Sequence, residues 1–510
     1  ANGTIELSNI VGTNAGASGA VAVGNTSTGT LTLDGTVYKT DNTQTYTAAT
    51  GGGNIDITGA ATFTTSADNI SFATSGVDLG ANVAITTGTT TNIGNVSFDG
   101  AIEAANAGTQ TLTIDSGAGD VTFSKKIGET NALGGLDVNS TAGDGDGDIV
   151  FTEDIGDSSA GVKGTTAVGN SSTNQIRFLE DTYTFDTGTT TFTTADGDKI
   201  VLEKGADTTF TTVGTNISFA GGHIKLNDGS DLIVNTGTGN GDITIAEIAG
   251  TTIETVSLNA GTGTTSVGAI GSGTEIGQLD IGSSANGGIT LNGAIVTDGA
   301  VTIDGPVTLA TTAVSVTTAD DNISFNHSID GSQTLTLKSG SGAIVIDGAI
   351  GADHTKILTG LSINATDGDT GTIEITDIGD DNAEGVNTGT VSIGNNATTS
   401  LTLDGTIYKT DGATIYEAKS GDTILLTGAD VLIQTKADNL TFDLGNLVLS
   451  TDGTTTINTN LNAASDAGNL QIDGKINTSS STEALVLNAG TGTLTVDGAI
   501  GDTGAFTTIT

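Results

Sequence analysis

The sequence predicts an all-β protein built as a β-solenoid, a rod of short strands stacked turn upon turn. Aliphatic residues alternate with Thr in segments such as Thr111-Leu112-Thr113-Ile114, which is the pattern of a strand with one buried face. Gly, Asp-Gly or Asn-Gly interrupts these segments about every 8–12 residues, as expected between strands. Related motifs also return along the chain, as they do in repeat architectures.

Three motifs mark the repeats. The segment 31–40 returns at 401–410 with Val37 replaced by Ile407. Asn-Ile-Ser-Phe or a close variant occurs four times, and a Gly-x-Gly element leads three times into Gly-Ala-Ile-Gly. These motifs divide the chain into an N-terminal β segment and four β repeats, which lie at 1–30, 31–175, 176–288, 289–400 and 401–510.

The alternation also predicts which side chains face the interior. In the first Asn-Ile-Ser-Phe motif, Ile70 and Phe72 share one parity and should point inward, whereas Asn69 and Ser71 should point outward. A narrow solenoid interior favours small aliphatic residues with Gly at its corners. The recurring tyrosines, among them Tyr38, are expected to stack over a corner of the turn.

A second all-β architecture, tandem Ig-like β-sandwiches, is the alternative. In sandwiches the Asp-Gly pairs would form type I′ hairpin turns between antiparallel strands. The chain of 510 residues has one Pro, no Trp and no Cys. It therefore lacks the Cys…Trp…Cys framework of Ig domains, and the solenoid is the better prediction.

Composition excludes several functions. Lys and Arg number 14 against 59 Asp and Glu, a formal net charge of −45, so we expect no nucleic acid partner. The chain contains no run of 18 apolar residues, so we expect no transmembrane segment. Paired carboxylates could hydrolyse sugars, but sugar clefts also need aromatic and basic groups, and Arg177 is the only Arg. We therefore expect no enzyme.

Two groups of acidic residues predict calcium sites. Carboxylates that alternate with Gly on a loop can supply the oxygen ligands that Ca²⁺ prefers, and the arrangement occurs twice. It is not the EF-hand spacing, and solvated acidic turns are the other interpretation. The candidate metal ligands are Asp144, Asp146, Asp148, Asp154 and Asp157 in the first group, and Asp367, Asp369, Asp377 and Asp380 in the second.

The rhythm of these motifs resembles the repeat regions of large bacterial surface proteins. Strands like Asn-Ile-Ser-Phe, turns like Asp-Gly-Ala-Ile and Thr-rich faces are similar to filamentous-haemagglutinin-like and β-strand-repeat proteins over nearly the whole chain. The chain lacks the Asn-Pro-Asn motif of the two-partner secretion domain near its start. The resemblance implies an extracellular rod used for adhesion or as a structural fibre.

These observations together predict an extracellular, non-catalytic structural protein at the cell surface. The absence of Cys, Met and Trp leaves few side chains to oxidise, which suits a secreted chain. Open strand edges at the ends of a solenoid can pair with other copies. We therefore expect a self-assembling subunit of a filament, sheath or surface layer. The alternative is the stalk of a large surface adhesin, with cell-surface glycans as further partners.

Overall fold

A computed structural model describes most of the chain. The described residues are 3–11, 19–88, 93–141, 147–227, 229–251, 253–282, 287–311, 313–450, 452–460, 468–479 and 482–510. They form strands and no helix, stacked in about 20 turns of a β-solenoid. The all-β and β-solenoid predictions are confirmed. The structure offers, in these ranges, no helix with the length and apolarity of a membrane span.

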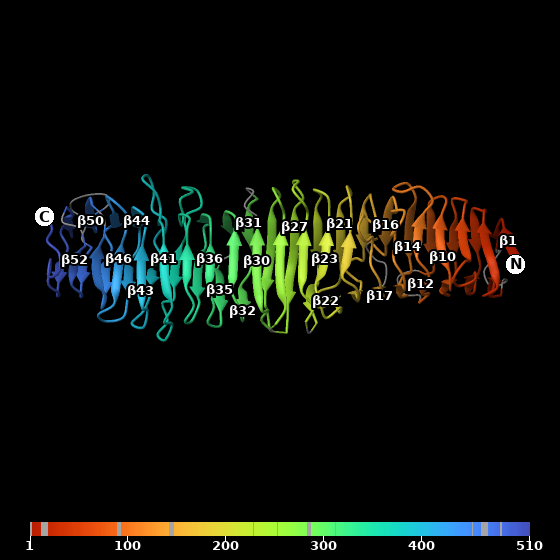
Figure 1. Ribbon diagram of the computed structural model, residues 1–510, viewed down its shortest axis with the longest axis horizontal. Coiled ribbons are helices and arrows are strands. Elements are labelled where there is room, and N and C mark those ends of the chain that lie inside the picture. The colour runs from red at the N-terminus through yellow and green to blue at the C-terminus, as the bar shows by residue number, and fades with distance from the viewer. Residues whose placement is uncertain are drawn as a thin grey trace. The chain divides into compact units, whose positions relative to one another are not determined.

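The chain divides into two compact units, unit 1 at Ala1–Thr265 and unit 2 at Ser266–Thr510. In each unit a turn contributes strands to three faces, and every pairing between named strands of a unit is parallel. Figure 1 shows these strands as rows of arrows lying side by side. Because sandwiches are built from antiparallel sheets, the parallel pairing excludes tandem Ig-like domains.

Unit 1 has three faces, named here in chain order. Face 1 contains β1 (Gly3–Leu7), β4 (Thr28–Leu33), β7 (Asn54–Ile57), β10 (Gly76–Leu79), β13 (Ile102–Ala104), β20 (Thr182–Thr184), β23 (Thr208–Thr211), β26 (Leu232–Asn235) and β28 (Thr255–Asn259). Face 2 contains β2 (Ile10–Val11), β5 (Val37–Lys39), β8 (Thr62–Thr64), β11 (Val83–Thr86), β14 (Thr111–Asp115), β16 (Gly135–Val138), β18 (Thr166–Val168), β21 (Thr190–Thr193) and β24 (Ile217–Ala220). Face 3 contains β3 (Val21–Gly24), β6 (Gln44–Thr47), β9 (Ile70–Ala73), β12 (Val96–Phe98), β15 (Val121–Phe123), β17 (Asp148–Phe151), β19 (Gln175–Phe178), β22 (Asp198–Leu202) and β25 (His223–Leu226). β27 (Ile243–Ala249) bends from face 2 to face 3.

Unit 2 repeats the plan. Its face 1 contains β30 (Gln278–Gly282), β33 (Val301–Asp304), β36 (Ile323–Phe325), β39 (Ile344–Ile346), β41 (Thr372–Ile375), β43 (Ser400–Leu403), β46 (Thr423–Leu426), β49 (Asn446–Leu449) and β52 (Ile476–Thr478). Its face 2 contains β31 (Ile289–Leu291), β34 (Val307–Leu309), β37 (Ile329–Asp330), β44 (Ile407–Thr410), β47 (Leu432–Thr435), β50 (Thr454–Asn458), β53 (Ala484–Asn488) and β55 (Thr508–Ile509). Its face 3 contains β32 (Ile295–Thr297), β35 (Ala313–Thr318), β38 (Thr334–Lys338), β40 (Gly360–Ile363), β42 (Val391–Ile393), β45 (Thr414–Glu417), β48 (Leu440–Asp443), β51 (Leu470–Ile472) and β54 (Leu494–Val496). β29 (Thr265–Ile270) pairs with both β31 and β32.

The inward and outward parities follow the sequence. Ile70 and Phe72 on β9 are fully buried, whereas Asn69 is exposed and Ser71 is half-buried, as the alternation predicts. Gly occupies corners where turns approach each other closely. A Cβ on Gly35 would lie 1.0 Å from the main-chain oxygen of Ser8, so the Asp-Gly turn accepts no side chain there.

The interior of unit 1 differs from the expected small-aliphatic core. A column of stacked rings runs through face 3, with centroids 4.8–5.6 Å apart in successive turns. The rings belong to Tyr46, Phe72, Phe98, Phe123, Phe151 and Phe178. Because parallel strands in register place each ring on the equivalent ring of the next turn, large side chains fit. Tyr38 and Tyr46 are buried and stack on Phe63 and Phe72, and the Tyr38 hydroxyl bonds the corner at Gly35.

The recurring motif also lies on different faces. In unit 1, Asn-Ile-Ser-Phe is on face 3 as β9 and on face 2 as β24. In unit 2 its copies are on face 1 as β36 and on face 3 as β48. Any face accepts the motif because each strand needs only two inward apolar side chains. The four repeat boundaries drawn from such motifs stay a prediction.

Candidate functional site

The described members of the first acidic group lie at the start of β17 of unit 1 (Asp148) and in the segment after it (Asp154 and Asp157). Asp144 and Asp146 lie outside the described residues. Asp148, on β17, accepts a hydrogen bond from Asn174 Nδ2 at 2.6 Å, and its own N–H donates to Asp120 Oδ1 at 2.9 Å. These contacts link three consecutive turns, so Asp148 helps to hold the stacked turns together.

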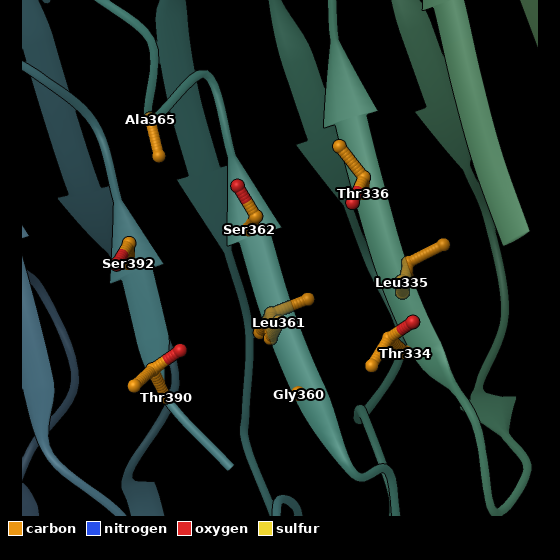
Figure 2. Close-up of a pocket in the computed structure, with 9 residues that line it drawn as sticks. All are labelled: Thr334, Leu335, Thr336, Gly360, Leu361, Ser362, Ala365, Thr390 and Ser392. Atoms are coloured by element: carbon orange, nitrogen blue, oxygen red, sulfur yellow. The ribbon is translucent and has the colours of Figure 1, made fainter. Parts of the chain in front are cut away.

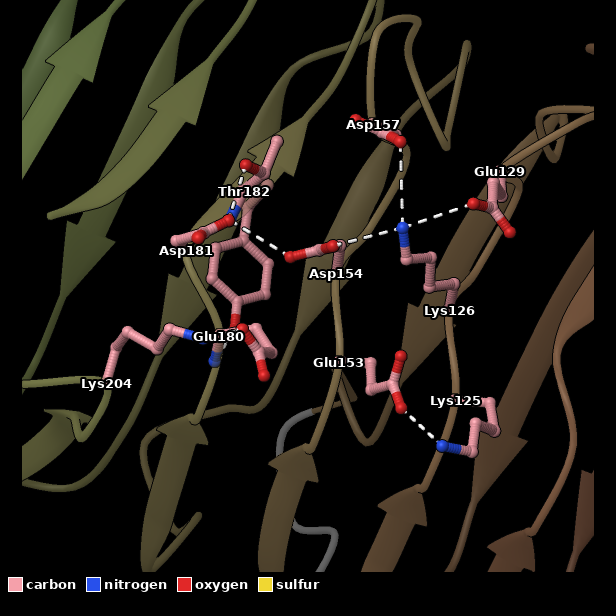
Figure 3. A network of polar contacts seen from close by, with 11 residues as sticks. Lys125, Lys126, Glu129, Glu153, Asp154, Asp157, Glu180, Asp181, Thr182 and Lys204 are labelled. Atoms are coloured by element: carbon pink, nitrogen blue, oxygen red, sulfur yellow. Dashed lines mark hydrogen bonds and ion pairs between the residues drawn. The ribbon is translucent and has the colours of Figure 1, made fainter. Parts of the chain in front are cut away.

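Asp154 and Asp157 share a lysine. Lys126 Nζ lies 3.4 Å from Asp154, 3.6 Å from Asp157 and 3.1 Å from Glu129, and Figure 3 shows the ammonium between the three carboxylates. Burial raises the pKa of Asp154, while a hydrogen bond from the Thr182 N–H and the Lys126 charge lower it. A metal cation bound by Asp154 and Asp157 would therefore have to displace the Lys126 ammonium.

The structure brings Asp154 together with two residues that the sequence did not single out. Carboxylate oxygens of Asp154, Glu180 and Asp181 lie within 4.8 Å of one another. Lys204 forms an ion pair with Glu180, so two lysines already serve this cluster (Figure 3). Glu180 and Asp181 come from the turn after Asp154. Their position beside Asp154 depends on the number of residues in that turn, which the sequence pattern does not predict.

The second acidic group is spread along unit 2. Asp367 accepts from Asn396 Nδ2 at 3.1 Å, and Asp377 accepts from the N–H groups of Thr406 and Ile407 at 2.9 and 2.8 Å. Asp377 therefore binds the main chain of the next turn, whereas Asp148 binds the Asn174 side chain. Within the described ranges, the members of this group do not meet as one set of metal ligands.

Asp369 and Asp380 have contrasting surroundings. Asp369 is buried, Lys338 Nζ lies 3.8 Å from its Oδ1, and its Oδ2 has no hydrogen-bond partner among the described residues. Burial raises the pKa of Asp369. Asp380 accepts from the N–H groups of Asn382 and Ala383, which together outweigh its slight burial and lower its pKa. The calcium prediction for both groups stays a prediction.

A recurring contact links corner acids and amides of successive turns. A corner Asn or Asp accepts, through Oδ1, the N–H of the equivalent residue in the next turn, at 2.9–3.0 Å. This occurs from Asn69 to Asn95, Asn95 to Asp120, Asp120 to Asp148, Asn216 to Asp242, Asn322 to Ala343, Asn439 to Asn469 and Asn469 to Thr493. Main-chain donors that leave the sheet at a corner need such partners. The repeated Asn of the motif is therefore a cap between turns.

Each unit also carries a shallow groove on one face. In unit 2 a groove of about 480 Å³ lies over β38, β40 and β42, where Gly360 leaves the floor bare between Thr334 and Thr390 (Figure 2). A groove of about 330 Å³ over β14, β16 and β18 of unit 1 has Gly135 in the same role. The groove in unit 2 is lined by hydroxyl and aliphatic groups with no ionisable side chain, so its lining supplies no general acid or base.

Comparison with protein-family models, with curated proteins and with solved structures found no match to this chain.

Proposed function

We propose that this chain is an extracellular structural protein that self-assembles end to end as the subunit of a filament, sheath or surface layer. The observation that carries the proposal is the state of the outermost described turns. Core-type side chains are uncovered there: Leu494 is 45% exposed, Ile500 37% and Ile509 52%. Equivalent positions in inner turns, such as Leu470 and Ile476, are buried.

The first described turn of unit 1 also carries aliphatic residues that are not fully covered. On β1, Ile5 and Leu7 are half-buried, and on β3 the same holds for Val21 and Val23. Aliphatic residues thus lie at the inward positions of both edges. A second copy could extend the parallel ladders by one more turn, because unpaired strand edges accept further strands. Covering a large aliphatic side chain contributes about 1.5–3 kcal/mol when burial is complete.

The net charge favours this end contact over side-by-side packing. A charge of −45 makes the long faces of neighbouring copies repel, and salt or bridging cations weaken that repulsion. The alternative is the stalk of a surface adhesin. In that case the same edges are covered by further turns of one longer polypeptide, and glycans would be bound elsewhere in that protein.

The test is negative-stain electron microscopy and sedimentation of the purified chain, with EDTA or with millimolar Ca²⁺. We expect filaments of constant width in the wild type and discrete particles in the end variant Leu494→Lys/Ile509→Lys. The matched control is Val213→Lys/Ile253→Lys, which charges two residues that are 61% and 62% exposed away from both edges; it should still assemble.

Discrete wild-type particles in both buffers would overturn the proposal and leave the adhesin stalk. Equal loss of assembly in the end variant and the control would show that the edges are not the contact. Assembly that needs Ca²⁺ and is lost in Asp377→Asn, which keeps an acceptor oxygen for the Thr406 N–H, would support a calcium role for the second acidic group.

A further inference from the structure

Three carboxylates stand in line on face 3 of unit 2. Glu417 on β45 pairs in register with Asp443 on β48. Phe442 pairs with Ile472 on β51, and the Asp473 N–H donates to the Phe442 carbonyl at 3.0 Å, so Asp473 occupies the next place in the same line. Consecutive turns are one strand spacing apart, about 4.8 Å. We call Glu417, Asp443 and Asp473 the acid column.

The acid column has no cationic partner among the described residues. The lysines nearest in sequence pair with other acids: Lys419 with Asp422, Lys436 with Asp411 and Lys475 with Asp502. From β45 the group that faces Asp443 is Glu417, and from the turn after β51 it is Asp473. Asp367 adds a further negative charge near Glu417. Gln471 Nε2 donates to Asp473 Oδ1 at 2.7 Å, and the Leu444 N–H donates to Asp443.

Unit 1 contains a similar line with better support. Asp56, Asp78 and Glu103 pair in register on face 1. There Asn54 Nδ2 donates to both aspartates. Glu103 accepts hydrogen bonds from the N–H groups of Thr130 and Asn131, which lie one solenoid turn later. In the acid column of unit 2 the Leu444 N–H donates to Asp443 and lowers its pKa, but the described contacts give the column fewer donors than the line in unit 1.

Partial burial and repulsion both favour the protonated form. Burial raises the pKa of Asp443, and the hydrogen bond and charge of Asp473 raise it further. Burial also raises the pKa of Glu417, with added contributions from Asp443 and Asp367. Two carboxyl groups can share a hydrogen bond only when one of them carries a proton. A proton held between turns would thus convert a repulsive contact into a bond.

We propose that the acid column is a proton-uptake device that strengthens the stacking of β45, β48 and β51 as the pH falls from 7 towards the ordinary titration range of carboxyl groups. Glu417 and Asp443 bind protons more tightly in the folded protein than in the unfolded chain. Stability therefore rises as pH falls and is lost as pH rises through the folded-state values. This is opposite to the usual acid sensitivity of carboxylates that accept strong hydrogen bonds, such as Asp380.

The experiment is amide hydrogen exchange of the full chain at pH 5 and pH 7 in EDTA at fixed ionic strength, corrected for the intrinsic pH dependence of exchange. The readout is protection in peptides that cover β48 and β51. In the wild type we expect greater protection at pH 5 than at pH 7, because Glu417 and Asp443 take up protons more readily in the folded than in the unfolded chain. Asp443→Asn should show that higher protection at both pH values.

The matched control is Glu374→Gln on β41, which removes one charge whose in-register neighbours are Val345 and Thr402. It should keep the wild-type pH response in β48 and β51. An equal response in Asp443→Asn and Glu374→Gln would overturn the proposal in favour of overall charge repulsion. Unchanged or lower wild-type protection at pH 5 would overturn it as well. Neither result depends on whether the chain forms filaments.

Discussion

The two copies of the Leu-Thr-Leu-Asp-Gly segment show how one substitution changes a buried polar contact. In unit 1, Tyr38 accepts a hydrogen bond from the Gly35 N–H and donates to the Leu7 carbonyl, both at 2.8 Å. In unit 2, Tyr408 accepts from the Gly405 N–H at 2.8 Å and donates to the Ile375 carbonyl at 3.0 Å. These first tyrosines have the same role, tying the corner to the preceding turn.

The second tyrosines differ. Tyr46 donates to Gln44 Oε1 at 2.8 Å, and Gln44 Nε2 donates to Tyr38 O and Thr64 O. In unit 2 the position of Gln44 is occupied by Thr414, whose hydroxyl lies 2.7 Å from Thr410 Oγ1. Tyr416 is fully buried, and its hydroxyl has no hydrogen-bond partner among the described residues.

The comparison of Tyr46 with Tyr416 shows that a repeated sequence does not guarantee the same hydrogen bonds. Both tyrosines keep the stacking ring of the next turn, Phe72 at 5.4 Å and Phe442 at 5.3 Å between centroids. Apolar packing is therefore preserved, while the polar contact depends on one residue two positions away. An unpaired buried hydroxyl costs about 1–3 kcal/mol, so unit 2 should be weaker at this turn.

The largest loss of stability is expected at two buried asparagines that make the same hydrogen bonds in unit 1 and unit 2. Asn139 accepts the Ser116 N–H and donates to Ser116 Oγ, both at 2.8 Å, and Asn364 makes the same bonds with Ser339 at 2.8 and 2.9 Å. Both are buried at positive φ, 49° and 43°. Asn139→Ala and Asn364→Ala should each destabilise by about 3 kcal/mol, because a buried donor is left unpaired and Ala disfavours this backbone.

Urea unfolding followed by circular dichroism measures this prediction, with hydrogen exchange to locate the damage. The control is Asn174→Ala, which removes an exposed amide that bonds Asp148. If either buried variant loses less than its control does, the paired bonds are not what stabilises these turns.

The next effect tests the difference between the copies directly. Gln44→Thr gives unit 1 the residue of unit 2 and should destabilise by about 2 kcal/mol, because Tyr46 Oη loses its acceptor and a small void forms. The urea midpoint should fall, and exchange should rise in β6 and β9. An unchanged midpoint would mean that the Gln44 contacts contribute nothing net.

The reciprocal change should stabilise the second copy. Thr414→Gln offers Tyr416 Oη an acceptor and should raise stability by about 1 kcal/mol, seen as slower hydrogen exchange in β45 and β48. Thr414→Val is the control, since it keeps the size of Thr and supplies no acceptor. A gain in the Val variant equal to that of the Gln variant would contradict the hydrogen-bond explanation.

The smallest effect comes from removing the hydroxyls. Tyr416→Phe should be neutral or stabilising by up to about 0.5 kcal/mol, because it deletes an unpaired group, whereas Tyr46→Phe should destabilise by about 1 kcal/mol. Both variants keep the stacked ring, so each is the control of the other in the same urea experiment. Equal changes would show that the two hydroxyls are equivalent in the folded protein.

Much of the fold could be predicted because it is encoded locally. Alternation between Ile and Thr indicates which side chain is inward, as at Ile70 and Phe72, and Asp-Gly indicates a corner, as at Gly35. The candidate site could be predicted less well. Asp154 was singled out, but its neighbours Glu180 and Asp181 come from the next turn, and the pairing lysines Lys126 and Lys204 were not anticipated.

The sequence by itself determined the strand class, the inward parity and the acidic character of the chain, since each depends on residues within one strand or on composition alone. Tertiary structure decided which residues meet across turns. Stacking places the ring of Tyr46 on that of Phe72, with centroids 5.4 Å apart, and sets Glu417 beside Asp443 in register. Turn length varies from one repeat to the next, so the residue that lies one turn away follows from the register of the parallel ladder.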